Sequence, residues 1–277
     1  GTETNRKADR GVETVIQNPL LLDIPSFVPE YQEEIEYGYK NKPRENLEKL
    51  LRKTSKNHCM YCYCLLQNDR VNIGNLEHSI EKSIDEEHLT DCVPNISITC
   101  PYCNQSLKRI GEKKRVEAII PSVRNFTSNL ECKGRKCKSE CDNYKELKSK
   151  YCKESQIILQ PMGVKGEDSG QDYRLQYDVE KAEFIPSKKY SYDVKDIKYI
   201  NHHINQFKLN DKSFKTKALV CFVEDVVEAE GRYRKNRKYP NYIVDLFKES
   251  IQDLSREEVL ELCEQISVRN FLLFRNT

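Results

Sequence analysis

Cysteine pairs and a neighbouring Glu-His dipeptide are the residues of this chain whose types and spacing could do chemistry. "CMYC" at 59–62 and "CPYC" at 100–103 each have the two-residue gap that lets two thiolates bind one metal ion. Four thiolates saturate a tetrahedral zinc ion, so these pairs predict a structural zinc site, and catalysis must occur elsewhere. The predicted Zn²⁺ ligands are Cys59, Cys62, Cys100 and Cys103.

Oxygen and imidazole donors offer a second centre between the cysteine pairs. "LEHSIEKS" at 76–83 contains Glu77 and His78, and Asn104 directly follows the second pair, where a zinc ion would hold it in position. Carboxylate and amide oxygens suit Mg²⁺ or Mn²⁺, and a neutral imidazole accepts a proton near pH 7. These residue types favour a divalent ion beside a basic histidine.

The order of these residues resembles a known signature. "LEH" at 76–78, Asn95, and "CPYCN" followed by Lys108 are similar to the HNH endonuclease family in its zinc-stapled, ββα-metal form. The resemblance implies that His78 activates water and that Glu77 and Asn104 hold one divalent ion. It further implies that Asn95 braces the loop and the histidine.

A looser resemblance extends downstream. "IILQP" at 157–161, "FIPS" at 184–187 and "INQFKLND" at 204–211 resemble the PtuB-like HNH nucleases of Septu-type antiphage defence. This resemblance implies DNA as the substrate and a separate ATPase subunit as the gating partner, since the chain has no P-loop motif. Two alternatives stay open: a stand-alone restriction or homing-type HNH nuclease, and a non-catalytic zinc-stapled module that binds nucleic acid or protein.

Basic clusters predict the contacts to substrate. The chain has 46 Lys and Arg against 44 Asp and Glu, so any affinity for nucleic acid must be local. Tyr233 and Tyr239, in the basic segment "GRYRKNRKY" at 231–239, could stack on bases, and a solvated turn is the alternative. The predicted phosphate-binding residues are Lys108, Arg109, Arg232, Arg234 and Lys235.

Other cysteines and histidines leave alternatives. Cys64 could replace Cys62 as a ligand, and His88 could share a metal with Cys92. His202 and His203 are expected at the surface or in packing, and Cys221 and Cys263 in the core. A further group forms either a second four-thiolate zinc site or free thiols: Cys132, Cys137, Cys141 and Cys152.

Periodicity predicts an α+β fold, in which the HNH resemblance implies a central ββα-metal finger. A helix should start at Pro43 with Leu47, Leu50 and Leu51 on one stripe. A hairpin turning at 67–69 should end near Leu76, and a second hairpin should occupy 172–186. Further helices should bury the stripes Val194, Ile197, Ile200, Ile204, Phe207; Leu219, Phe222, Val223, Val226, Val227; Ile243, Leu246, Phe247, Ile251; and Leu262, Cys263, Ile266, the last opened by a Ser255–Glu258 capping box.

The predicted site sets a condition on the backbone at Glu77 and His78. Adjacent residues of a regular strand point to opposite faces, so Glu77 and His78 can share a site only if the strand ends or distorts there.

Apolar runs are too short to cross a bilayer and no export signal is evident, so we expect a cytoplasmic protein without membrane contact. The predicted division is an N-terminal arm and helix (1–56), the HNH core (57–112), a basic cysteine-rich insertion with a hairpin (113–190) and a helical C-terminal region (191–277).

Overall fold

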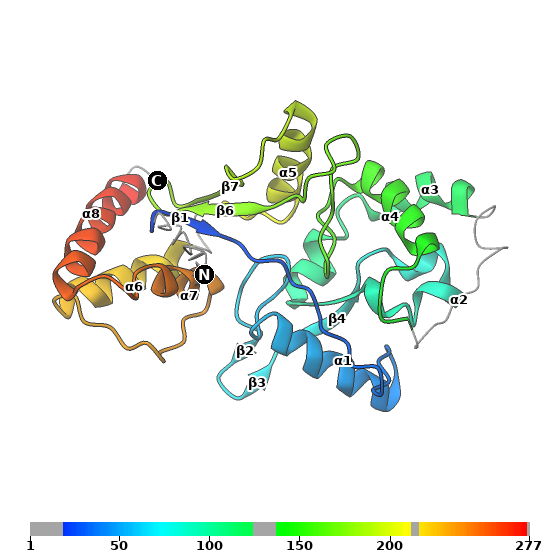
Figure 1. Ribbon diagram of the computed structural model, residues 1–277, viewed down its shortest axis with the longest axis horizontal. Coiled ribbons are helices and arrows are strands. Elements are labelled where there is room, and N and C mark those ends of the chain that lie inside the picture. Colours follow the sequence, from blue (N-terminus) through cyan, green and yellow to red (C-terminus); the bar gives the residue numbers. More distant parts are fainter. Residues whose placement is uncertain (1–18, 124–136, 212–215, 276–277) are drawn as a thin grey trace, which may run out of the picture.

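The computed structural model describes residues 19–123, 137–211 and 216–275 and has an α+β fold with small antiparallel sheets. Figure 1 shows helices α6 to α8 at one end of the chain, a three-stranded sheet in the middle, and helices α1 to α4 around a short hairpin at the other end. The C-terminal helices are α6 (Thr216–Glu228), α7 (Tyr242–Ser250) and α8 (Arg256–Arg275).

The hairpin that carries the candidate site is formed by β4 (Asn75–His78) and β5 (Ile96–Thr99), which pair in antiparallel register. The sequence predicted that the strand ending near Leu76 would pair with the segment before it. Instead, that segment folds into its own short hairpin, β2 (Gln67–Asn68) and β3 (Val71–Asn72). The predicted hairpin therefore forms, but its second strand ends at Asn72, and the strand through Leu76 pairs with β5, which follows a long connection that local alternation cannot reveal.

Short helices complete the finger. The connection from β4 to β5 contains η1 (Lys82–Ile84), α2 (Glu86–Leu89) and η2 (Val93–Asn95). After β5 the second cysteine pair opens a helical segment whose π-helical part is η3 (Cys103–Leu107). The order along the chain is therefore β4, β5 and then this helical segment.

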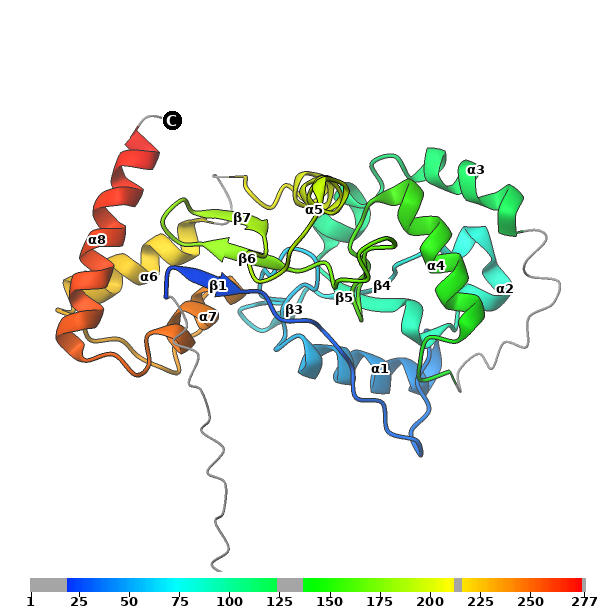
Figure 2. The same ribbon diagram turned by 45° about the horizontal axis from the view of Figure 1, so that its top comes forward.

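Larger helices pack around the finger. Helix α1 (Asn41–Thr54) buries Leu47 and Leu51, as its predicted stripe requires. Helices α3 (Glu112–Val123) and α4 (Asp142–Ser155) pack against each other beside the β4–β5 connection (Figure 2). They supply side chains that reach the candidate site.

A three-stranded sheet joins distant parts of the chain. Strand β1 (Leu21–Asp23) pairs with β6 (Leu175–Asp178), which pairs with β7 (Glu183–Pro186) in the predicted second hairpin. The first cysteine segment also bonds to the start of α7, with Leu65 N–H donating to the Pro240 carbonyl. Contacts therefore cross the boundaries that the sequence suggested.

The C-terminal helical predictions were confirmed with two exceptions. The Ser255–Glu258 capping box forms, with both reciprocal hydrogen bonds. Helix α5 (Val194–Gln206) buries Ile200 and Ile204 but exposes Val194 and Ile197, and Cys221 is exposed rather than in the core. Helical spacing identifies a possible stripe, but the neighbouring elements decide how much of it is covered.

Within the described residues, no helix is both long enough and apolar enough to span a bilayer.

Candidate zinc centre and active site

Four cysteines converge at the base of the β4–β5 hairpin. The sulfur atoms of Cys59, Cys62, Cys100 and Cys103 all lie within 4.8 Å of one another, and all four residues are buried. Cys62 Sγ and Cys100 Sγ are 3.7 Å apart, close to the separation of about 3.8 Å between thiolates on one tetrahedral zinc ion. The donor set therefore fits a structural Zn²⁺ site, as predicted.

Backbone hydrogen bonds shape both cysteine turns. Tyr63 N–H donates to the Cys59 carbonyl, and Cys103 N–H donates to Cys100 Sγ over 3.4 Å. Met60 N–H bonds to the Ile98 carbonyl of β5, which ties the first turn to the second. The Cys64 thiol borders Cys59, Cys62 and Cys100 but is not part of the group whose sulfurs all lie within 4.8 Å of one another, and the His88 ring pairs with Asp85 at 2.8 Å.

The second cysteine group does not assemble into one site. Cys141 caps the start of α4 and Cys152 lies near its end, so the two are about 16 Å apart along the axis at about 1.5 Å per residue. One zinc ion cannot bind both, and Cys137 joins no metal-binding group among the described residues. Cys132 lies outside the described residues. The four-thiolate reading of this group was wrong because a straight helix separates two of its members.

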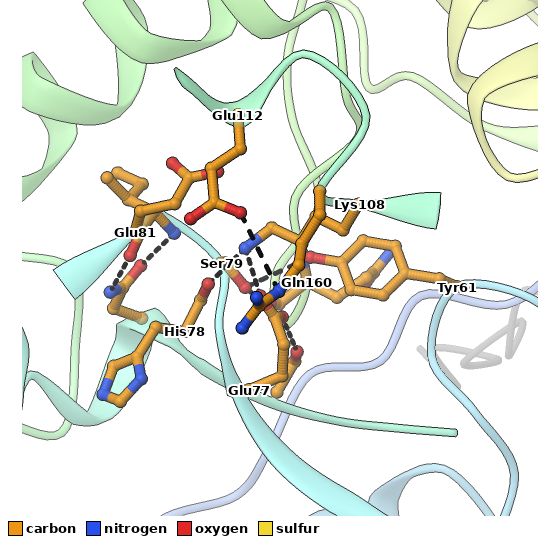
Figure 3. A network of polar contacts seen from close by, with 12 residues as sticks. Tyr61, Glu77, His78, Ser79, Glu81, Lys108, Glu112 and Gln160 are labelled. Atoms are coloured by element: carbon orange, nitrogen blue, oxygen red, sulfur yellow. Dashed lines mark hydrogen bonds and ion pairs between the residues drawn. The ribbon is translucent and has the colours of Figure 1, made fainter. Parts of the chain in front are cut away.

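Strand β4 places Glu77 and His78 on opposite faces. Glu77 pairs with Ser97 and His78 with Ile96, and this register is regular up to the last residue of the strand. The strand does end at His78, as expected, but no distortion turns the two side chains toward each other. Figure 3 shows the His78 ring pointing away from Glu77.

Glu77 lies in a buried ion pair. Its Oε1 accepts from the Lys108 ammonium, and its Oε2 accepts from Ser97 Oγ at 2.8 Å. The Lys108 ammonium also donates to the His78 carbonyl (Figure 3). The Glu77 and Lys108 side chains are only 3% and 6% exposed. Lys108 is therefore not available to substrate here, contrary to the prediction, because its ammonium neutralises Glu77.

Among the described residues, one ring nitrogen of His78 has no hydrogen-bond partner. Its Nε2 lies 3.0 Å from the Thr90 carbonyl, which can only accept, so Nε2 carries the proton and Nδ1 keeps the lone pair. The Tyr39 ring covers the imidazole with its centroid 4.4 Å away, and His78 is 8% exposed. Burial lowers the pKa of His78, with smaller opposing effects from the Thr90 carbonyl and Glu77, so the neutral form is favoured.

Asn95 braces the loop that follows His78. Its Oδ1 accepts from Ile80 N–H at 2.8 Å and its Nδ2 donates to the Ile80 carbonyl at 2.9 Å. Tyr144 from α4 donates to the same Oδ1 at 3.1 Å. Asn95 is completely buried. This is the geometry expected of a bracing residue rather than of a group that touches substrate.

The other predicted residues of the finger have less defined surroundings. Asn104 is half-buried at the start of η3, and its N–H donates to the Cys100 carbonyl at 3.1 Å. Arg109 is exposed, with its Nε 4.0 Å from the Glu112 carboxylate. Asn104 is thus anchored through the zinc-binding turn, and Arg109 is accessible to a ligand.

A second buried ion pair lies beside the site and was not predicted. Arg115 Nη2 donates to Glu81 at 3.0 Å and to the Lys108 carbonyl at 2.6 Å, and Tyr151 O–H donates to Glu81 at 2.7 Å. Arg115 Nη1 also donates to the Ile110 carbonyl at 2.6 Å. The pair fixes the backbone of Lys108. Charged residues in a polar stretch gave no sequence signal for it.

Sequence reasoning also missed the residues around His78. The Tyr39 ring has Arg44 Cζ at 5.3 Å and Lys82 Nζ at 5.8 Å from its centroid. Tyr39 is held by its N–H, which donates to Asp91 at 2.9 Å. An aromatic ring flanked by two cations therefore covers the histidine. Only tertiary structure brings residues 39 and 44 to the end of β4.

The basic segment 231–239 lies between α6 and α7, toward the end of the molecule away from β4 in both views (Figures 1 and 2). Its predicted phosphate-binding residues, Arg232, Arg234 and Lys235, are exposed. The predicted stacking residues are not free: Tyr239 is buried and donates to Asp225 at 2.6 Å, and Tyr233 packs on Phe222. Their apolar surface completes the α6–α7 core instead.

The remaining histidine prediction fits the structure. His203 is buried, and its Nδ1 accepts from Ile158 N–H at 3.1 Å, whereas His202 is exposed.

Comparison with known proteins identified no matching protein family, no curated relative and no matching solved structure.

Proposed function

We propose that this chain is an HNH-type endonuclease that hydrolyses DNA phosphodiester bonds with His78 as the general base. The observation that carries the proposal is the tautomer of the His78 imidazole. Its Nε2–H is held by the Thr90 carbonyl, which leaves a basic Nδ1 on a loop that Asn95 braces. A closed zinc centre stabilises the hairpin and takes no part in the chemistry.

In this proposal the chain supplies a base and positive charge. Nδ1 of His78 accepts a proton from the water that attacks phosphorus, the P–O bond on the opposite side breaks, and the leaving oxygen takes a proton from solvent. Arg44 and Lys82 neutralise phosphate oxygens near the ring, and Tyr39 offers a face for a base. Arg109 adds an exposed positive charge on the helix of the finger.

The arrangement does not fit a divalent ion at Glu77 and Asn104. Both Glu77 oxygens already accept hydrogen bonds, one from an ammonium, and the carboxylate is nearly inaccessible. Oxygen donors of this kind suit Mg²⁺ or Mn²⁺, but a metal ion could bind only after Lys108 left the carboxylate. The metal dependence implied by the HNH resemblance is therefore a separate point for experiment.

The covered site supports a regulated enzyme. Tyr39 lies over His78, and Lys108 neutralises Glu77, so substrate can reach the histidine only after local rearrangement. This is expected of a cytoplasmic defence effector that a partner ATPase subunit activates, as the PtuB-like resemblance implies. A stand-alone restriction or homing-type nuclease would instead cut without a partner.

A plasmid-cleavage assay tests the proposal. Wild type and His78→Ala are compared at equal zinc content, with Mg²⁺, with Mn²⁺ and with neither, and His202→Ala serves as the matched exposed control. We expect His78→Ala to lose at least about a hundredfold in rate, while His202→Ala keeps wild-type activity. Equal cleavage by wild type and His78→Ala would refute the assignment.

The buried state of the site also favours a second candidate, a zinc-stapled binding module. A module would bind DNA or a protein without cutting under any metal condition, even with a copurified ATPase present. Cleavage that appears only when an ATPase copurifies would identify a gated nuclease. Cleavage by the isolated chain would identify a stand-alone enzyme.

A further inference from the structure

A basic pocket of about 360 Å³ lies at the C-terminal end of α1, next to the first cysteine pair. We call it the α1 pocket. Its lining combines the end of α1 and the turn after it with the basic segment 231–239. The residues that matter are Arg52, Lys53, Lys56, His58, Lys238 and Asp245.

His58 is the unusual member of this lining. It is 3% exposed, and neither ring nitrogen has a hydrogen-bond partner within the described chain. Its ring lies beside Tyr242, with centroids 5.0 Å apart. The backbone at Ser55 and Lys56 lies near the ring, but no contact meets hydrogen-bond geometry, so the N–H has lost water without a full replacement. A ligand in the pocket that accepts one hydrogen bond would satisfy it.

Two lysines of the α1 pocket carry uncompensated charge. Lys53 and Lys238 are exposed, and neither has an ion pair in the described parts of the chain. The remaining charges of the lining are neutralised by neighbours: Arg52 by Glu48, Lys56 by Glu249, and Asp245 by Lys248. The pocket therefore offers about two positive charges and one buried donor.

We propose that the α1 pocket binds a phosphate-class oxyanion, with His58 donating through its N–H and with Lys53 and Lys238 balancing the charge. The pocket has room for a phosphoryl group, and two ammonium groups match its charge of one to two. This site does not depend on the proposed nuclease activity. The phosphate could belong to a nucleic-acid backbone or be free in solution.

If the phosphate belongs to a nucleic-acid backbone, the position of the α1 pocket predicts how a duplex would lie. Tyr39, which covers His78, lies just before α1, and the α1 pocket lies at the other end of that helix, about 20 Å away at about 1.5 Å per residue. A duplex bound along α1 would span about six base pairs between the two points. Lys238 would then connect the basic segment 231–239 to the same duplex.

Phosphate binding to the zinc-replete full chain tests the site without any cleavage. Inorganic phosphate is titrated by calorimetry in chloride buffer at constant ionic strength. The test variant is Lys53→Gln/Lys238→Gln, and the control is Lys188→Gln/Lys217→Gln, which removes two exposed lysines elsewhere. We expect the test variant to weaken phosphate binding at least about tenfold, and the control less than about twofold.

His58→Phe removes the donor and keeps the ring volume, and its zinc content reports whether the turn is intact. We expect it to lose phosphate binding while retaining zinc. Absence of phosphate binding by wild type, or equal binding by the two double-lysine variants, would overturn the proposal whatever happens to His58→Phe.

A DNA-binding measurement identifies the source of the phosphate. Duplex binding is measured over a salt series without divalent ions, so cleavage does not contribute. For a backbone phosphate, the test variant should reduce the slope of log affinity against log salt by about two, and free phosphate should compete with DNA. For a free phosphate, the same variant should lose phosphate binding and keep the DNA slope of the control.

Discussion

The two cysteine groups of this chain differ in what surrounds each cysteine. In the first, Cys59, Cys62, Cys100 and Cys103 lie on tight turns at the base of one hairpin, and their sulfurs converge. In the second, an α-helix holds Cys141 and Cys152 at opposite ends. Convergence of thiolates therefore depends on the backbone between them, and the number of cysteines is not sufficient.

Cys100→Ser should have the largest effect. It removes one ligand from a closed site whose metal binding is coupled to folding. Metal binding to such a site contributes about 10 kcal/mol to the folding free energy, and the substitution should remove most of it. We expect loss of stoichiometric zinc and of the cooperative unfolding transition, measured by metal analysis and circular dichroism. Cys152→Ser should retain one zinc per chain. A zinc-replete, stable Cys100→Ser protein would contradict the structural site.

Glu81→Gln tests the link between the zinc-stapled hairpin and α3 and α4. The amide keeps the shape of the carboxylate but leaves the Arg115 guanidinium buried without a counter-charge. Breaking a buried pair in this way should cost about 3–5 kcal/mol in the free energy of unfolding, measured by urea denaturation. The matched control is Glu167→Gln, which breaks an exposed pair with Lys153 and should cost at most about 1 kcal/mol.

Acid should destabilise the hairpin region through its histidines. Burial lowers the pKa of His78 below its usual 6.5, so between the two pKa values the unfolded chain binds a proton that the folded chain does not. Stability is therefore present above pH 6.5 and decreases as the pH falls through that range, by at most about 1.4 kcal/mol per pH unit for this group.

The measurement is urea denaturation between pH 7.5 and 5.5. His78→Gln should show a shallower loss of stability on acidification than wild type, because the titrating group is gone. An equal slope in the two proteins would assign the acid sensitivity to other groups, including His58, whose pKa burial also lowers.

Cys141→Ser should have the smallest effect and the opposite sign. Cys141 occupies the N-cap of α4 and makes no capping hydrogen bond, whereas serine is a preferred N-cap residue. We expect a gain of about 0.5–1 kcal/mol in the free energy of unfolding, with unchanged zinc content. Loss of zinc or of stability would mean that Cys141 is a ligand after all.

The parts that the sequence predicted correctly depend on local pattern. The CxxC spacing gave all four converging cysteines, and helical periodicity gave the buried stripes of α1 and α6. Each of these inferences needs only residues that are close in sequence or a motif of fixed spacing. The expectation that Glu77 and His78 share one site was wrong, because β4 stays regular to its last residue and its neighbours face opposite sides.

The errors involve contacts between distant residues. Lys108 was expected at the substrate, but it neutralises Glu77 across the finger, and Tyr239 was expected to stack on bases, but it packs in a helical core. The Arg115–Glu81 pair and the Tyr39 cover had no sequence signal, because ordinary charged and aromatic residues carry them. Such pairings become visible only when α1, α3 and α4 are placed around the hairpin.

By itself, the sequence determined the four converging cysteines, the Glu77-His78 segment between them and the α+β class, because metal-ligand spacing and hydrophobic periodicity act over short distances. Tertiary structure alone decided that Glu77 and His78 face opposite sides with separate partners. It also decided that one cysteine group converges and the other does not. The physical reason is that burial and charge pairing depend on which elements pack together, and packing is a property of the whole chain.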